Sequence, residues 1–99
     1  MTDRLTITLA QLNPVVGAIT ANIDKVRDAR RKAAADNADL ILCSELVVSG
    51  YPPEDLVLKP FFVDKVEAAV NEFAAETADG GPAVLLSAPW RNYGETYNA

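Results

Sequence analysis

The stretch Asp39-Leu40-Ile41-Leu42-Cys43-Ser44-Glu45 decides the fold of this chain. Its centre, residues 40–43, is a short continuous apolar run, which is typical of a β-strand that is covered on both faces. The run is followed directly by a carboxylate. We therefore predict a buried strand over Asp39–Ser44 with an acid, Glu45, at its carboxyl end.

Further strands are predicted on both sides of this run. Residues 5–11 alternate apolar and small polar side chains, with β-branched residues among them, until Asn13-Pro14 breaks the pattern. Residues 83–88 form a second apolar run, predicted to be a third buried strand. Asn92-Tyr93-Gly94 indicates a turn, and residues 96–99 indicate the start of a fourth strand.

Two amphipathic helices are predicted between these strands. The first runs from about Ala21 to Ala35, with Thr20 or Asn22 as its cap, and the second from Pro60 to about Thr77. Their apolar stripes are Ile23, Val26, Ala29 or Arg30, and Ala33 in the first helix, and Phe62, Val66, Ala69, Val70 and Phe73 in the second. Helical crossovers imply parallel strands, so the sequence predicts an α/β domain, or a piece of one, in the order β-α-β-α-β.

Composition and charge exclude several classes of protein. The chain has 99 residues, of which 49% are hydrophobic and 23% charged, as in ordinary soluble domains. A net charge of −5 argues against a nucleic-acid partner or an anionic membrane. No apolar run approaches the roughly 20 residues that span a bilayer, and the N-terminus does not resemble a signal peptide. We therefore expect a cytoplasmic protein.

The sequence also limits the chemistry that these residues can perform. There is no histidine, and the single cysteine, Cys43, cannot form an internal disulfide. Ser-His and Cys-His pairs and His-ligated metals are excluded, so acid/base work must come from carboxylates, lysine or tyrosine. The glycines form no phosphate-binding motif, and we predict neither a metal nor a cofactor in this chain.

Glu45 is the candidate catalytic residue. Ligand-binding groups in open parallel sheets gather beyond the carboxyl ends of the strands, and Glu45 is the acid placed directly at such an end. The apolar residues 46–48 that follow it favour the neutral carboxyl, which suits a general acid or base. The alternative is a structural Glu45 that caps a turn or faces solvent. Cys43 is expected on the same side of the strand, about 6.6 Å away between Cα atoms, and is interpreted as a core residue.

The loop after Glu45 carries three weaker candidates. Gly50-Tyr51-Pro52-Pro53 predicts an extended loop, because residues before proline avoid the helical region. Tyr51 either hydrogen-bonds a ligand or packs its ring on the proline pair. Glu54 and Asp55 are interpreted as residues that open a short helix, where the helix dipole favours acids, rather than as a metal site.

Several of these segments resemble one family. They are Leu9-Ala10-Gln11-Leu12-Asn13-Pro14-Val15-Val16-Gly17, Asn22, Ala38-Asp39-Leu40-Ile41, Glu45-Leu46 and Gly50-Tyr51-Pro52. This set resembles the start of the nitrilase, or carbon–nitrogen hydrolase, superfamily. The continuation Pro53-Glu54-Asp55-Leu56 and Leu58-Lys59-Pro60-Phe61 is similar to the glutaminase domains of bacterial glutamine-dependent NAD synthetases.

The resemblance implies a fold and a mechanism. The fold is an α-β-β-α sandwich, of which residues 1–99 form the incomplete N-terminal β-α-β-α-β part. A Glu-Lys-Cys triad hydrolyses glutamine to glutamate and ammonia. Glu45 matches the glutamate and Tyr51 lies in the loop beside the glutamine pocket, whereas the lysine and the cysteine are expected beyond Ala99.

The family also implies partners outside this chain. These are a synthetase domain that uses ATP and magnesium, and further copies of the whole protein in a homo-oligomer. This sequence departs from the family pattern in two places: Cys43-Ser44 replaces an aromatic residue and proline, and Ala18 replaces an acid. The loss of proline leaves the backbone before Glu45 less restrained. The alternatives are a stand-alone amidase and a non-catalytic α/β interaction module.

Overall fold

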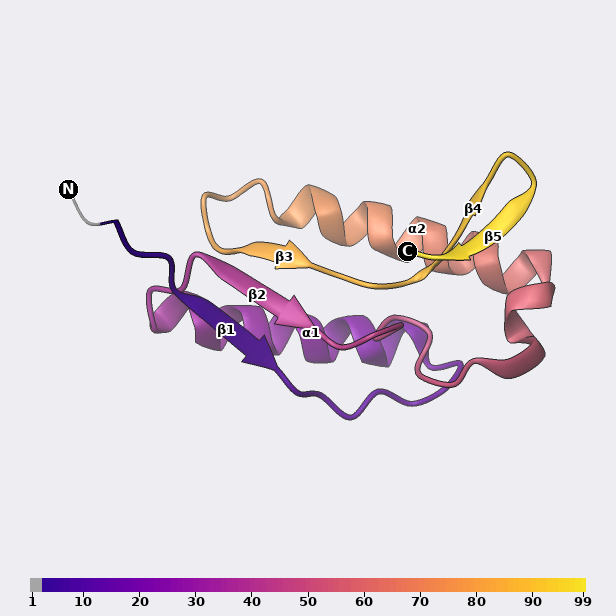
Figure 1. Ribbon diagram of the computed structural model, residues 1–99, viewed down its shortest axis with the longest axis horizontal. Helices are drawn as coiled ribbons and strands as arrows, with labels where there is room; N and C mark the ends of the chain where they lie inside the picture. Colours follow the sequence, from indigo (N-terminus) through magenta and orange to yellow (C-terminus); the bar gives the residue numbers. More distant parts are fainter. Residues whose placement is uncertain (1–2) are drawn as a thin grey trace.

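The computed structural model describes residues 3–99 (Figure 1). Its elements, in chain order, are β1 (Ile7–Ala10), α1 (Ile19–Ala35), β2 (Leu40–Cys43), the 3₁₀ helix η1 (Glu54–Leu58), α2 (Pro60–Glu76), β3 (Ala83–Leu85), β4 (Pro89–Asn92) and β5 (Glu95–Asn98). The predicted alternation of strands and helices as far as β3 is confirmed. The second helix begins at Pro60 as expected and ends one residue before Thr77.

The first three strands form one parallel sheet in the order β1-β2-β3. Leu40 is the register partner of Ile7 on one side and of Ala83 on the other. Parallel neighbours need a crossover, which α1 supplies between β1 and β2, and α2 between β2 and β3. The carboxyl ends of all three strands therefore lie along one edge of the sheet.

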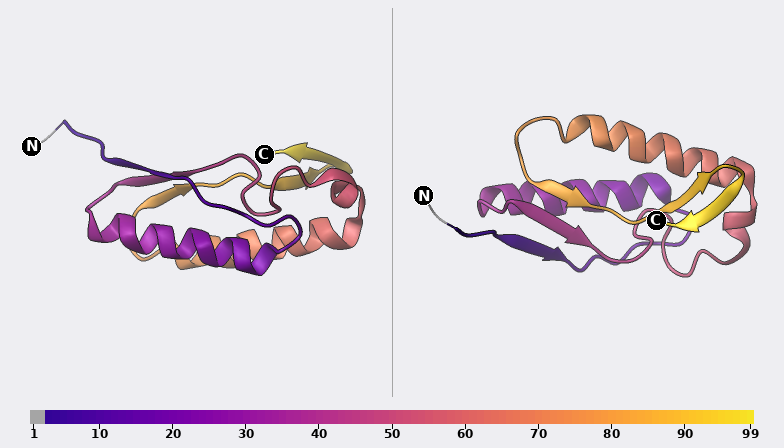
Figure 2. Two further views of the ribbon diagram at one scale, coloured as in Figure 1. Left: turned by 90° about the horizontal axis from the view of Figure 1, so that it is seen from below. Right: turned by 45° about the horizontal axis from the view of Figure 1, so that its top comes forward.

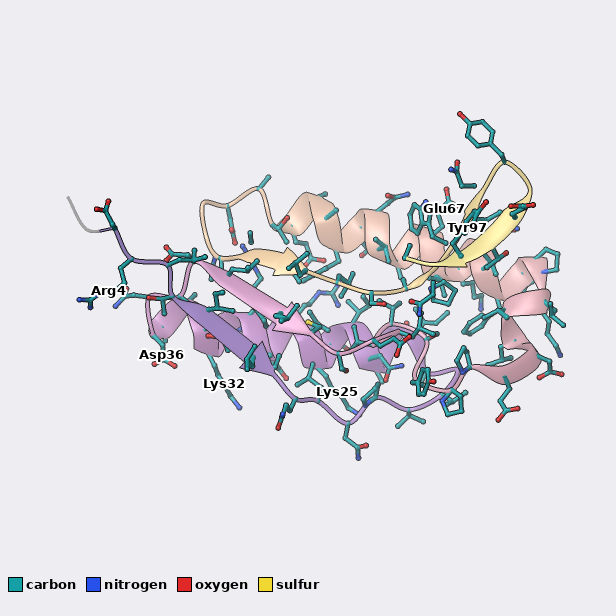
Figure 3. All side chains as sticks on the ribbon, in the orientation of Figure 1. Arg4, Lys25, Lys32, Asp36, Glu67 and Tyr97 are labelled. Carbon is teal, nitrogen blue, oxygen red and sulfur yellow. The ribbon has the colours of Figure 1, made fainter. Side chains whose placement is uncertain are left out.

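Both helices cover the same face of this sheet, as Figure 2 shows in its left view. The core lies between the sheet and the two helices. It is built from alternate strand residues and the apolar helix stripes, and Ile41, Val26 and Val66 are completely buried. The charged side chains of Lys32 in α1 and of Asp36, the residue directly after α1, project into solvent (Figure 3). The predicted apolar stripes of both helices are thus confirmed as the core faces.

The opposite face of the sheet is apolar and exposed. Leu9 is 67% exposed, Leu42 39% and Leu85 54%. The prediction that the second and third strands are buried on both faces is therefore wrong for this chain, because residues 3–99 place no second layer over that face. Residues on the helix side, Ile41 above all, meet the expectation, whereas their neighbours in the strand do not.

The start of α1 differs from the prediction. The helix begins at Ile19, and the residue before it, Ala18, makes no side-chain capping bond. Neither Thr20 nor Asn22 is the cap, because both lie inside the helix. Asn22 is completely buried and its side chain turns to the loops beside it rather than to the helix end.

The last residues form an antiparallel hairpin of β4 and β5. Tyr93 and Gly94 have φ angles of 52° and 81°, as the two central residues of a type I′ hairpin turn require, so the predicted turn is confirmed. The predicted third strand, residues 83–88, ends at Leu85, and residues 89–91 directly after the predicted segment begin a separate strand. Proline cannot donate to a ladder, and Pro89 takes the first position of β4, where none is needed. Tyr97 lies on this hairpin beside α2 (Figure 3).

Within residues 3–99 no helix has both the length and the apolar character needed to cross a membrane.

Candidate active site

Glu45 lies at the carboxyl edge of the sheet, as the sequence predicts, and Ser44 separates it from the end of β2. A turn covers residues 45–49. It directs the side chains of Leu46, Val47 and Val48 into the core, where each is at most 6% exposed, while Glu45 itself is exposed. The expectation that Glu45 has apolar surroundings is therefore wrong, because the apolar residues next to it in sequence point the other way.

The Glu45 carboxylate has a specific partner. Asn98 of β5 donates a hydrogen bond from Nδ2 to Glu45 Oε1 at 2.5 Å. The next residue, Leu46, has a positive φ of 52° and donates its backbone N–H to Ser87 Oγ at 2.9 Å. Ser87 Oγ in turn lies 3.4 Å from Asn98 Oδ1, to which it donates its proton. These contacts join the turn after β2 to the segment after β3 and to the hairpin.

A buried asparagine ties the same turn to the loop after β1. Asn22 Oδ1 accepts the N–H of Val15 at 2.8 Å, and Nδ2 donates to the carbonyls of Val15 at 2.8 Å and Val48 at 3.0 Å. The fully buried side chain thereby satisfies three backbone groups from two loops. Asn22 is the residue that the sequence suggested as a cap; its actual role is to hold the two loops together at the carboxyl edge.

Gly50 closes the turn at a position that excludes other residues. Its φ is 79°, and a Cβ atom there would lie 2.6 Å from the backbone N and Cα of Val16. The same approach lets Gly17 donate its N–H to the carbonyl of Ser49 at 2.9 Å. Close backbone packing thus fixes the loop that follows Glu45.

Cys43 is a core residue. It is buried in β2, and desolvation raises the pKa of its thiol. A raised pKa keeps the sulfur protonated, whereas a nucleophile needs the thiolate. The expectation that Cys43 and Glu45 share one side of the strand is wrong, because β2 ends at Cys43 and the turn carries Glu45 out to solvent.

The remaining predicted residues lie in the loop beyond Gly50. Tyr51 is 61% exposed, which favours an accessible side chain over a ring buried against the proline pair. Glu54 and Asp55 lie in the first turn of η1, as interpreted from the sequence. Within residues 3–99 no group of three or more His, Cys, Asp or Glu side chains is arranged to hold a metal ion.

A cleft of about 630 Å³ lies between η1, α2 and the hairpin. Its walls are largely apolar, with Val57, Val63 and Pro89 among them, and Arg91, which forms an ion pair with Asp64, is also part of its lining. Leu46 and Asn98 line it as well, so the cleft opens next to the Glu45 carboxylate.

Sequence reasoning missed Asn98 and Ser87. A signal for Asn98 was present, because the predicted turn at residues 92–94 folds the following strand back over the preceding one. Asn98 then pairs with Pro89, close to the end of β3. The contact with Glu45 itself spans 53 positions and has no local pattern.

No family model matches the chain. It is 46% identical over all of its 99 residues to the glutamine-dependent NAD(+) synthetase of Rhodobacter capsulatus, of which it covers 18%. The chain is homologous to the glutamine-dependent NAD(+) synthetases. This homology confirms the resemblance inferred from the segments around Glu45 and Tyr51. The matched region is the N-terminal part of these enzymes, and the chain spans less than a fifth of the length of this relative.

Solved structures agree with this relationship. The glutamine-dependent NAD(+) synthetase of Cytophaga hutchinsonii superposes with a TM-score of 0.86 at 30% identity, over 95% of this chain and 16% of that one. An amidase from Nesterenkonia sp. superposes with a TM-score of 0.75 at 28% identity, over 93% of this chain and 34% of that one. The predicted fold, the β-α-β-α-β part of a nitrilase-type sandwich, is thereby confirmed.

Proposed function

We propose that this chain is the N-terminal part of a glutamine amidohydrolase domain that releases ammonia from glutamine for ATP-dependent synthesis of NAD. The observation that carries the proposal is the position of Glu45. This residue lies at the carboxyl edge of the parallel sheet. The turn that contains it is fixed by the hydrogen bond from Asn22 to the Val48 carbonyl and by the close packing of Gly50 on the backbone of Val16. Homology to the glutamine-dependent synthetases supports the choice of glutamine.

In this proposal Glu45 is the general base and then the general acid. It takes the proton of a cysteine thiol supplied by a later segment, and the thiolate attacks the side-chain amide of glutamine to form a thioester. Glu45 next gives the proton to the departing ammonia, and water hydrolyses the thioester. One carboxylate oxygen bonds Asn98, which leaves the other for this proton transfer.

Other parts of the site are also proposals. Tyr51, exposed in the loop after the turn, would contact the glutamine substrate. ATP and magnesium would bind a synthetase domain outside these residues. A cytoplasmic location and a homo-oligomeric assembly of the longer protein remain predictions, the latter to be measured by light scattering.

The test compares two nitrogen sources in the longer protein that carries this chain. Glu45→Gln should lower glutamine-driven NAD formation by about 100-fold to 10,000-fold, the usual contribution of a general base. NAD formation from ammonium chloride should be unchanged, because free ammonia bypasses the amidohydrolase. Glu72→Gln, the same change at an exposed position of α2, is the matched control. Full glutamine-driven turnover by Glu45→Gln would support a non-catalytic module instead.

The 99-residue chain alone should release no ammonia from glutamine. A base without its nucleophile cannot form the thioester, and Cys43 is buried and protonated. Ammonia release by the purified chain, measured with an enzymatic ammonium assay, would contradict the proposed division of the triad.

The second candidate is a stand-alone amidase. The superposition on the Nesterenkonia sp. amidase supports it, with a TM-score of 0.75 at 28% identity. In that case the longer protein hydrolyses simple amides and forms no NAD from either nitrogen source. Assaying both reactions on one preparation separates the two functions.

A further inference from the structure

We infer that Asn98 is a positioning residue for the Glu45 carboxylate; the inference rests on the proposed role of Glu45. Asn98 Nδ2 donates to Glu45 Oε1 at 2.5 Å, a contact between the hairpin and the turn after β2. Glu45 is exposed and its long side chain is otherwise free to rotate. A hydrogen bond to one oxygen therefore selects a rotamer and leaves the second oxygen for proton transfer.

The orientation of the Asn98 amide follows from its second contact. Ser87 Oγ accepts the N–H of Leu46 at 2.9 Å, so its own proton is available for Asn98 Oδ1 at 3.4 Å. A carboxylate only accepts, so the N–H₂ side of Asn98 must face Glu45. The amide is thus held between one donor and one acceptor, and the reversed orientation would place two oxygens against each other.

The hairpin gives Asn98 a fixed position. Next to it, Ala99 exchanges both backbone hydrogen bonds with Ala88, at 2.8 and 3.1 Å. On the other strand, Arg91 is paired with Asp64 of α2. Asn98 is therefore attached both to the segment after β3 and, through its hairpin, to the second helix.

The same network restrains the backbone at Glu45. Residues 43 and 44 include no proline that would restrict the backbone before Glu45, and Leu46 has a positive φ of 52°. The hydrogen bond from the Leu46 N–H to Ser87 Oγ restrains the backbone on the C-terminal side of Glu45. Ser87 thus restrains the backbone next to Glu45, and Asn98 restrains the Glu45 side chain.

The test uses Asn98→Ala and Asn98→Asp in the longer protein. With Asn98→Ala, kcat for glutamine-driven NAD formation should fall about 10-fold to 100-fold, the usual effect of a misplaced catalytic group, while KM for glutamine stays within about twofold. Asn98→Asp keeps the shape but sets a second carboxylate against Glu45, so its kcat should be lower still. If Asn98 only stabilised the hairpin, Asn98→Asp should retain a higher kcat than Asn98→Ala, because aspartate has nearly the same shape as asparagine.

The controls separate this inference from the proposed function. Asn71→Ala, an exposed asparagine of α2, should leave both reactions unchanged, and ammonium-driven NAD formation should be normal in every Asn98 variant. A kcat for Asn98→Ala within twofold of the parent, or a parallel loss of ammonium-driven activity, overturns the positioning role. A loss confined to Glu45→Gln then leaves the proposed function standing, whereas an active Glu45→Gln variant removes the proposed function itself.

A spectroscopic measurement tests the contact without activity. In the ¹⁵N-labelled 99-residue chain, Glu45→Gln should shift the side-chain N–H₂ resonances of Asn98, and Glu72→Gln should not. Unshifted Asn98 resonances in Glu45→Gln overturn the inference whatever the turnover measurements give.

Discussion

The replacement of Asn22 by alanine is the sharpest test of how the carboxyl edge is held. The completely buried side chain makes three hydrogen bonds, to the N–H and carbonyl of Val15 and to the carbonyl of Val48. Alanine keeps the helix but leaves these three backbone groups without their partner. We expect the whole edge to loosen, because no other side chain among residues 3–99 bonds the backbone of both loops.

The size of the effect follows from burial. Val48 is completely buried, so its unpaired carbonyl should cost about 1–3 kcal/mol. Val15 is 54% exposed, and water can replace its two bonds, so we assign these only the net value of about 0.5 kcal/mol each. The sum is roughly 2–4 kcal/mol, which corresponds to a decrease in Tm of about 10–30 °C for a domain of this size.

Urea unfolding of the 99-residue chain, followed by far-UV circular dichroism, measures this free energy. Asn71→Ala on the exposed side of α2 is the matched control and should change it by less than about 0.5 kcal/mol. Asn22→Asp should be at least as destabilising as alanine, because its carboxylate faces the Val48 carbonyl where an N–H now donates. If Asn22→Ala unfolds within about 0.5 kcal/mol of the parent with an unchanged m value, the reasoning is refuted.

Three further predictions concern the turn, the sheet and the helix pair. Gly50→Ala should destabilise the chain by more than about 1 kcal/mol, since its φ is 79° and the added Cβ meets backbone at 2.6 Å; an unchanged urea midpoint contradicts this. Ile41→Ala should cost about 2–5 kcal/mol and Leu42→Ala under about 1 kcal/mol, because Ile41 is completely buried and Leu42 is 39% exposed; equal losses in the two variants would show that both strand faces are packed. The Arg30 guanidinium lowers the pKa of Asp79, so this pair stabilises the fold above the ordinary aspartate pKa near 3.9, and the contribution is lost as the pH falls through the lower folded-state pKa. Asp79→Asn should therefore flatten the fall of the urea midpoint below pH 4, and equal slopes in both proteins would count against it.

The exposed face of the sheet shows how tertiary context overrides a strand pattern. Leu42 and Ile41 are adjacent in the same apolar run, yet Ile41 is completely buried in the core and Leu42 is 39% exposed. An unbroken apolar run indicates that both faces of the strand are suited to burial. The two helices cover one face of the sheet. Within residues 3–99 nothing covers the other, so the prediction for that face is wrong here although the strand itself is correct.

Neighbouring residues in the sequence were enough to predict the strands and helices as far as β3, their parallel order and the place of one acid after the central strand. Those features depend on short-range periodicity, on the proline that starts the second helix, and on helical crossovers, all of which can be read from neighbours in the chain. Only the tertiary structure decided the surroundings of Glu45. Its exposure depends on a turn with a positive φ at Leu46, and its partner Asn98 lies 53 positions away. Asn22 shows the same limit. An asparagine near a helix start suggested a cap, but its buried side chain bonds the N–H and carbonyl of Val15 and the carbonyl of Val48 instead.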